Sequence, residues 1–279
     1  MSAAPIIVEN VSKYYKFGVR GILIKALDGV SFSMRENEVL GLIGANGAGK
    51  STLIKIIIGA ARASSGRCLV FGAPLSRKSK TRIGYLPEAP YFYKFLTGFE
   101  LVRFYAKLSG MSSAEAKTAA MRALNLVGLG GAADRRVGLY SKGMLQRAGL
   151  AQAIVHNPDL VILDEPASGL DPAGAADMAE IILRLKREGK SVLLCSHIMS
   201  EVEALCDRVV AISKGRVAAQ GSIGELLGKK NSTEFVFDTD EPAKLEAIAA
   251  AAENAGARVL SRRPARMSMG EFFRTKVSK

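Results

Sequence analysis

The residues between positions 44 and 52 have the types and the spacing of a phosphate-binding loop. They match the template GxxxxGK[ST] and read, in order, Gly44, Ala45, Asn46, Gly47, Ala48, Gly49, Lys50, Ser51 and Thr52. Small residues let backbone N–H groups turn inward around phosphate oxygens, and a following helix directs its positive end at the same anion. We therefore expect all nine residues to contact a nucleotide, with Lys50 reaching its β- and γ-phosphates and the Ser51 hydroxyl ligating Mg²⁺. The alternative, a glycine-rich turn formed by chance, is disfavoured by the apolar strand predicted before the loop and the helix predicted after it.

Two adjacent carboxylates follow an apolar stretch further along the chain. Residues 160–163 read Leu-Val-Ile-Leu, and Asp164 and Glu165 come directly after them. The first carboxylate suits the Mg²⁺ shell, usually through water, and the second lies one pleat away and can polarise an attacking water. An acidic turn after a buried strand is the alternative. Combined with the phosphate loop, the pair favours hydrolysis of a nucleoside triphosphate, with Lys50 and Glu165 among the catalytic residues.

A serine and a glycine at the start of a predicted helix form a second possible anion site. The segment reads Tyr140-Ser141-Lys142-Gly143-Met144. It resembles the signature segment of ABC proteins, usually written LSGGQ, and the resemblance extends over about residues 5–222. It implies that Ser141 and the Gly143 backbone contact the γ-phosphate held by the phosphate loop of a second cassette. A complete ATP site then needs a dimer with another copy or a close homologue.

Other positions match the same family in order. Tyr15 resembles the aromatic residue that stacks on adenine, with Tyr14 as a neighbouring candidate. Asp171, at the end of Ser-Gly-Leu-Asp, resembles the D-loop that links the two sites of a dimer. His197 resembles the switch histidine, which implies a hydrogen bond to the γ-phosphate and a role in orienting the attacking water or Glu165.

Glu88 departs from the family pattern, because this position is usually glutamine. A carboxylate can still approach Mg²⁺ and water, but when ionised it cannot donate a hydrogen bond. The Leu-Pro-Glu sequence at 86–88 and the YSKGM signature together resemble the branch of the family with separate permease subunits, often used in export.

The elements expected to position these residues alternate along the chain. Short apolar strands are predicted at 38–43, 160–163, 191–195 and 209–212, with helical stretches between them. Such a pattern indicates an α/β fold whose parallel sheet is covered on both faces. The resemblance implies a P-loop NTPase of the ABC cassette type over residues 1–222, with a RecA-like core sheet, an antiparallel β edge and a helical subdomain at about 89–155.

The pattern changes after residue 222. Residues 223–279 are expected to form a small α+β appendage, with strands at 233–237 and 258–261, an alanine-rich helix at 242–255 and a short final helix at 270–276. Regulation, support of dimerisation and capping of the sheet all stay open as its role.

Composition narrows the partners and the location. The formal net charge of +13 favours anionic partners, but basic residues form no long run, so nucleic acid is not an expected partner. The three cysteines form no CxxC pair and are expected to be inert thiols of a reducing compartment. We see no signal peptide and no apolar stretch of about 18 residues. The resemblance then implies separate transmembrane permease subunits, with this chain bound at the cytoplasmic face of the inner membrane.

Aromatic residues gather at 91–105, after the loop that contains Glu88. In the ABC family this region receives a helix of the membrane subunit, so we expect residues 91–95 to contribute to docking and about half of the cluster to be core.

A soluble ABC ATPase acting on ribosomes or DNA is an alternative function, disfavoured because the chain has one uninterrupted cassette. A second alternative is an adaptor that binds nucleotide without hydrolysing it. The presence of Lys50, Asp164, Glu165 and His197 disfavours it.

Overall fold

The computed structural model describes residues 3–17, 22–227, 237, 239 and 241–259. The chain divides into two units, Met1–Leu227 and Gly228–Lys279. All candidate site residues lie in the first. In the second, the alanine-rich stretch forms α9 (Pro242–Asn254). The strand expected at 233–237, apart from Phe237, and the helix expected at 270–276 lie outside the described residues, as do the last two positions of the strand expected at 258–261.

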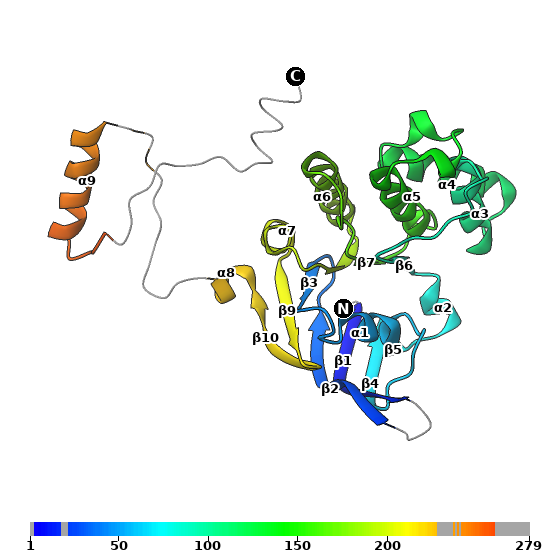
Figure 1. Cartoon of the computed structure of the whole chain (residues 1–279), viewed down its shortest axis with the longest axis horizontal. Helices are drawn as coiled ribbons and strands as arrows, with labels where there is room; N and C mark the ends of the chain where they lie inside the picture. The colour runs from blue at the N-terminus through cyan, green and yellow to red at the C-terminus, as the bar shows by residue number, and fades with distance from the viewer. Residues whose placement is uncertain (1–2, 18–21, 228–236, 238, 240, 260–279) are drawn as a thin grey trace. The chain divides into compact units, whose positions relative to one another are not determined.

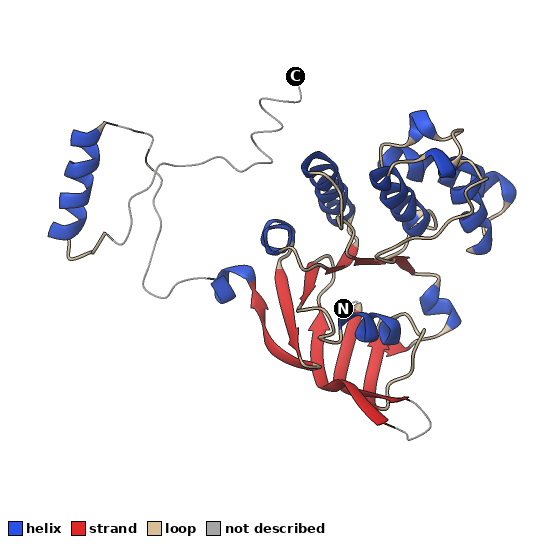
Figure 2. Ribbon diagram, in the orientation of Figure 1, coloured by secondary structure: helices blue, strands red, loops and turns tan. Residues whose placement is uncertain are grey.

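A six-stranded sheet forms the centre of the first unit (Figures 1 and 2). Neighbouring strands of this sheet pair in parallel, except for the two strands that come last in the sequence, β9 and β10, which pair antiparallel. In spatial order they are β10 (Arg216–Ser222), β9 (Arg208–Ser213), β3 (Val39–Ile43), β8 (Ser191–Cys195), β7 (Leu160–Asp164) and β6 (Ile83–Leu86).

Both faces of the parallel strands β3, β6, β7 and β8 are largely buried, as their apolar sequences predicted, whereas β10 at the edge has no buried residue. Along β7, Leu160 and Ile162 belong to one hydrophobic core, while Val161 and Leu163 belong to another. The side chains of a strand point alternately to opposite faces, so the two cores lie on opposite sides of the sheet. The doubly covered parallel sheet is therefore confirmed.

A four-stranded antiparallel sheet and one helix cover the first face. The strands are, in spatial order, β2 (Ile22–Met34), β1 (Ile6–Phe17), β4 (Ser65–Val70) and β5 (Ala73–Pro74). Helix α1 (Lys50–Ile57) contributes Leu53, Ile54 and Ile57 to the core that this sheet shares with β3. The packing holds the start of α1 beside the carboxyl end of β3.

The other helices include a group inserted between β6 and β7 (Figure 1). The inserted group consists of α3 (Gly98–Leu108), α4 (Ser113–Leu126), α5 (Lys142–Ile154) and the 3₁₀ turns Gly130–Ala132 and Val137–Leu139. Thr97 and Ser112 form capping boxes with Glu100 and Glu115, which explains why α3 and α4 begin where they do. The remaining helices are α2 (Arg77–Lys80), α6 (Pro172–Arg187), α7 (Met199–Leu205) and α8 (Ile223–Leu227).

Candidate active site

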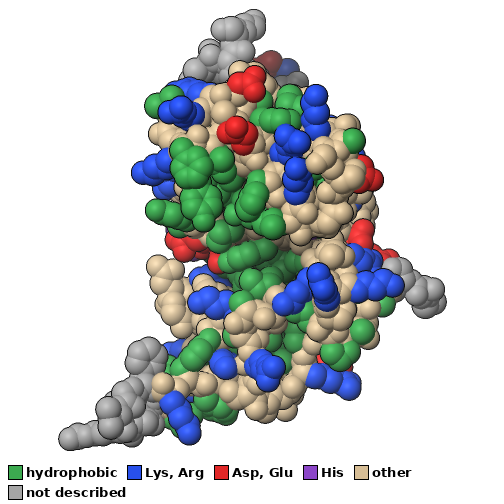
Figure 3. Space-filling view, turned by 90° about the vertical axis from the view of Figure 1, so that its right-hand side faces the viewer, with side chains coloured by type: hydrophobic (Ala, Val, Ile, Leu, Met, Phe, Trp, Pro, Cys, Tyr) green, Lys and Arg blue, Asp and Glu red, His purple; other side chains and the backbone are tan. Residues whose placement is uncertain are grey.

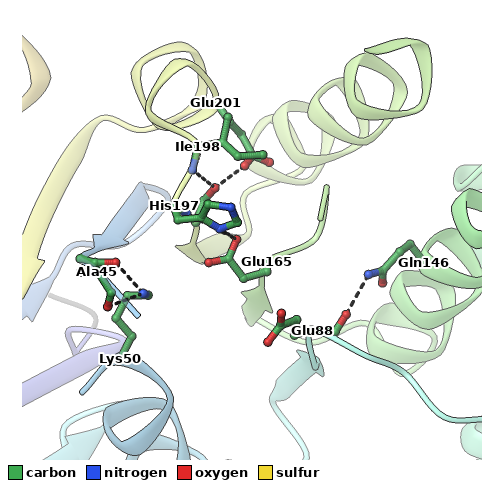
Figure 4. Close-up of polar contacts among 10 residues, drawn as sticks. Ala45, Lys50, Glu88, Gln146, Glu165, His197, Ile198 and Glu201 are labelled. Atoms are coloured by element: carbon green, nitrogen blue, oxygen red, sulfur yellow. Dashed lines mark hydrogen bonds and ion pairs between the residues drawn. The ribbon is translucent and has the colours of Figure 1, made fainter. Parts of the chain in front are cut away.

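The phosphate loop connects β3 to α1 and depends on glycine where the backbone turns. Gly49 precedes α1 with φ of 114°, and a Cβ there would lie 2.7 Å from the Ala26 carbonyl oxygen. Lys50 is the first residue of the helix and only 7% exposed. Its Nζ donates to the backbone oxygens of Gly44 at 2.6 Å and Ala45 at 3.3 Å (Figure 4). The ammonium group therefore lies inside the loop, while Ser51 is exposed at the start of the helix.

The two carboxylates at the end of β7 differ in backbone geometry. Asp164 is the last residue of the strand, whereas Glu165 has φ of +53°, a left-handed conformation that is costly for a residue with a Cβ. The Glu165 N–H donates to the Cys195 carbonyl oxygen at 2.8 Å, which ties this turn to the end of β8. The position of the Glu165 carboxylate is thus set by the turn rather than by the strand pleat.

His197 lies directly opposite this carboxylate. Its Nδ1 is 2.7 Å from Glu165 Oε2, although the two residues are 32 positions apart in the chain (Figure 4). The parallel pairing of β7 with β8 places Asp164 beside Cys195, so the residues that follow the two strands emerge together. The structure therefore brings together the expected base and the expected switch histidine.

A negative field surrounds Asp164. Its side chain is 8% exposed, and burial raises the pKa of this carboxyl, helped by the charges of Glu165 and Glu88 and opposed by the Cys195 thiol and Lys50. Carboxylate and hydroxyl oxygens are the donors that Mg²⁺ prefers. The donor set of Asp164, Glu88 and the exposed Ser51 hydroxyl fits such a cation by its chemistry.

The signature residues begin α5. The Ser141 side chain accepts a hydrogen bond from the Met144 N–H at 3.2 Å and so caps the helix. A Cβ at Gly143 would lie 3.7 Å from Leu170 Cδ2, an ordinary contact, so packing within the chain does not require glycine there. Among the described residues, no hydrogen bond joins Ser141 or Gly143 to Lys50 or Glu165.

Two further expected residues occupy separate positions. Asp171 caps α6 by accepting from the Gly174 N–H at 2.9 Å. Tyr15 lies on β1, with Lys13 Nζ 5.0 Å from its ring centroid, and the exposed Tyr14 has Lys25 Nζ at 5.7 Å. Because a lysine lies over each ring, this geometry does not choose between the two tyrosines.

Three residues at the site were not expected from the sequence. Gln146 is 2% exposed on α5, Ser196 is fully buried before His197, and Glu201 lies on α7. Glu201 follows His197 by four positions, about one helical turn, a spacing that could have indicated it, whereas Gln146 follows Ser141 by five positions and has no such signal.

The remaining sequence expectations concern the second histidine and the three cysteines. His156 Nε2 lies 3.0 Å from the Ile83 carbonyl oxygen, a structural contact as expected. Cys68, Cys195 and Cys206 are free thiols, and burial raises the pKa of Cys68 to about 11 and of Cys206 to about 12.

Comparison with known proteins identifies the family. The family model described as ABC transporter matches residues 27–168. An uncharacterized ABC transporter ATP-binding protein of Synechocystis is 37% identical over 95% of this chain and 82% of its own length. The linearmycin resistance ATP-binding protein LnrL of Bacillus subtilis is 37% identical over 79% of this chain and 70% of its own length. The chain belongs to the ABC transporter ATP-binding family.

Solved structures agree with this assignment. The cbiO1 protein of Clostridium perfringens, part of the transporter complex cbiONQ, superposes with a TM-score of 0.73 and 29% identity over 82% of this chain and 92% of that one. A bacterial ABC transporter cassette solved as a dimer superposes with a TM-score of 0.70 and 25% identity, covering 78% of this chain and 98% of that one. The expected cassette fold and ATPase class are confirmed. In the described part of the chain, no helix is both long enough and apolar enough to cross a membrane.

Proposed function

We propose that this chain hydrolyses ATP between two cassettes and so drives export through separate transmembrane permease subunits. The observation that carries the proposal is the Glu165–His197 pair, 2.7 Å apart beside the buried Asp164 at the end of β7. A base and its orienting partner are the groups that activate a water molecule. The presence of both groups favours a hydrolase over a module that only binds nucleotide.

Each residue of the site has a role in this proposal. Lys50 and the backbone N–H groups of residues 44–52 hold the β- and γ-phosphates, as the orientation of Lys50 Nζ into the loop supports. Ser51, Asp164 and Glu88 hold Mg²⁺, which supplies positive charge to neutralise the phosphate oxygens. Either Tyr15 or its neighbour Tyr14 stacks on adenine.

Hydrolysis then follows from the geometry of Glu165 and His197. A water oxygen attacks the γ-phosphorus, the bond from that phosphorus to the β–γ bridging oxygen breaks, and the water proton passes to Glu165. His197 orients this carboxylate through Nδ1. The products are ADP and phosphate.

A second cassette completes each site. In this proposal Ser141 and Gly143 contact the γ-phosphate bound by the partner, and Asp171 lies where the two sites communicate. The absence of a packing reason for glycine at position 143 supports this, because a side chain there would occupy the space of an approaching anion. ATP favours the closed dimer because it contacts both cassettes only in that state.

An exposed aromatic surface supports docking to a permease. Its residues are Tyr91, Tyr93 and Phe95, exposed by 90%, 62% and 69%. Phe92 is 8% exposed and belongs to the core, so the expectation that residues 91–95 contribute to docking narrows to these three. Figure 3 shows hydrophobic side chains gathered on the face that lies to the right in Figure 1, the side of the helices inserted between β6 and β7. Aromatic anchors suit an apolar helix of a membrane subunit, which would hold the cassette at the cytoplasmic face of the inner membrane.

Phosphate release and nucleotide binding test the proposal together. We expect wild-type protein to release phosphate from ATP, and the Glu165→Gln variant to bind ATP while losing most turnover. Glu203→Gln, an exposed carboxylate on α7, serves as the matched control and keeps full turnover. Unchanged turnover in Glu165→Gln would remove this residue as the base.

A further inference from the structure

The residue before His197 is enclosed in a small polar network. Ser196 is fully buried, and its Oγ donates a hydrogen bond to Glu201 Oε2. The same oxygen accepts from the Ile198 N–H at 3.1 Å (Figure 4). One hydroxyl therefore joins the two residues that flank His197 to a carboxylate on the first turn of α7.

This network takes the place of an ordinary helix cap. Ile198 precedes α7 and offers no side-chain hydrogen bond to it. In a capping box, a glutamate three positions after the cap residue accepts from the cap backbone N–H. Glu201 stands at that position but reaches Ser196 instead, and Ser196 takes up the N–H of Ile198. The loop before α7 is thereby held by a contact that includes residues on both sides of His197.

The other side of His197 is held by Glu165. The Oε2 of that carboxylate accepts from the His197 backbone N–H at 3.4 Å and lies 2.7 Å from Nδ1. The imidazole is itself 57% exposed, so packing alone does not fix its direction. Its orientation depends on the backbone of residues 196–198, which the Ser196–Glu201 contact restrains.

Glu201 also contributes to the electrostatics around His197. Burial raises the pKa of the Glu201 carboxyl, the hydrogen bond from Ser196 lowers it, Glu165 raises it and His197 lowers it. Glu201 is partly buried beside the proposed catalytic pair, whereas a carboxylate that only capped a helix at the surface would stay exposed.

We propose that Glu201 is a positioning residue for ATP hydrolysis, acting through Ser196 to hold His197 in register with Glu165. This inference rests on the proposed function, in which His197 orients the base. It predicts that Glu201 affects the rate of the chemical step and not the affinity for nucleotide.

Steady-state ATPase kinetics of single and double variants test the inference. Because misplacing a group by about 1 Å costs up to about 100-fold in rate, we expect Glu201→Leu to lower kcat about 10- to 100-fold, with KM for ATP changed less than about twofold. Ser196→Ala should lower kcat in the same way. Glu201→Gln keeps an acceptor oxygen for Ser196 and should restore most of the rate, and Glu203→Leu, on the exposed side of the same helix, should keep full kcat.

The background variant His197→Ala separates positioning from stability. We expect Glu201→Leu to cause almost no further loss of kcat in that background, because residues acting as one unit are not additive. An equal loss with and without His197 would show that Glu201 only stabilises the fold and would overturn the inference. Loss of kcat in His197→Ala but not in Glu201→Leu would overturn the inference alone. Full kcat in His197→Ala would overturn both the inference and the proposed role of His197.

Discussion

Gln146 donates a hydrogen bond from Nε2 to the backbone oxygen of Glu88, 2.9 Å away (Figure 4). The bond joins α5, which Ser141 caps, to the loop after β6. We expect a tilt of α5 to move this loop, which carries Glu88 and leads to the aromatic surface. The contact links the helix that is proposed to face a second cassette with the proposed permease surface.

Replacing Gln146 with leucine tests this link. The change removes the donor and leaves the Glu88 carbonyl without its partner, which costs about 1–3 kcal/mol if water does not replace it. We expect Gln146→Leu to reduce the stimulation of ATPase activity by the permease more than the basal rate. The measurement compares phosphate release with and without reconstituted permease, with Gln152→Leu on the same helix as the control. Equal losses in both conditions would contradict the link.

The Glu165→Gln variant tests the chemical step. Glutamine has nearly the same shape but cannot accept a proton, and general-base catalysis contributes roughly 10²–10⁴-fold. We expect kcat to fall by about that factor while the Kd for ATP changes little, measured by phosphate release and by nucleotide titration.

In the same titration the Lys50→Ala variant should lose tight binding of ATP, because the change removes the cation inside the phosphate loop.

The exposed aromatic surface is predicted to bind the permease. We expect Tyr91→Ala combined with Tyr93→Ala to reduce co-purification of the permease and coupled transport without lowering Tm, because both side chains are largely exposed. Leu227→Ala removes a comparably exposed apolar side chain elsewhere and is the control. Intact pull-down and transport in the double variant would end the docking assignment. Phe92→Ala is a poor probe, since it is predicted to destabilise the fold by about 3–5 kcal/mol.

Protonation of His156 is predicted to make the free energy of unfolding depend on pH. Burial lowers the pKa of this imidazole below 6.5, against a smaller opposing effect of the Ile83 carbonyl. At pH values between the lowered pKa of folded His156 and 6.5, the unfolded chain binds more protons than the folded chain. The free energy of unfolding therefore falls as the pH drops through this range, and the effect of His156 on it is absent above pH 6.5. The slope is at most about 1.4 kcal/mol per pH unit. Urea unfolding at several pH values should show a weaker dependence in His156→Gln than in the wild type, and identical dependences would contradict this.

Most of the fold, and the places of the proposed catalytic residues within it, could be predicted because the signals are local. Runs such as 160–163 are apolar at every position, and the residues that follow such strands carry the chemistry. The left-handed turn at Glu165 could not be predicted, because it is held by the Cys195 carbonyl of a neighbouring strand. Burial in the run 91–95 was equally hidden, since an irregular segment has no period that separates Phe92 from Tyr91.

The polar contacts of Gln146, Ser196 and Glu201 were missed for a related reason. A glutamine on a helix or a serine before a histidine is most often a solvated residue, and only the packed structure shows that Gln146 and Ser196 are buried and that Glu201 is partly buried. The roles of Ser141 and Gly143 stay predictions, because their proposed partner is another cassette.

The mass of the nucleotide-loaded protein tests the central claim most directly. Glu165→Gln should bind ATP without consuming it, so sedimentation with ATP and Mg²⁺ should detect a dimer that dissociates when ATP is removed. Adding Gly143→Asp places a negative charge at the start of α5, where the γ-phosphate of the partner is proposed to bind, and should return the protein to a monomer without loss of folding. A Glu165→Gln protein that binds ATP yet stays monomeric, both alone and beside its permease, would contradict the account.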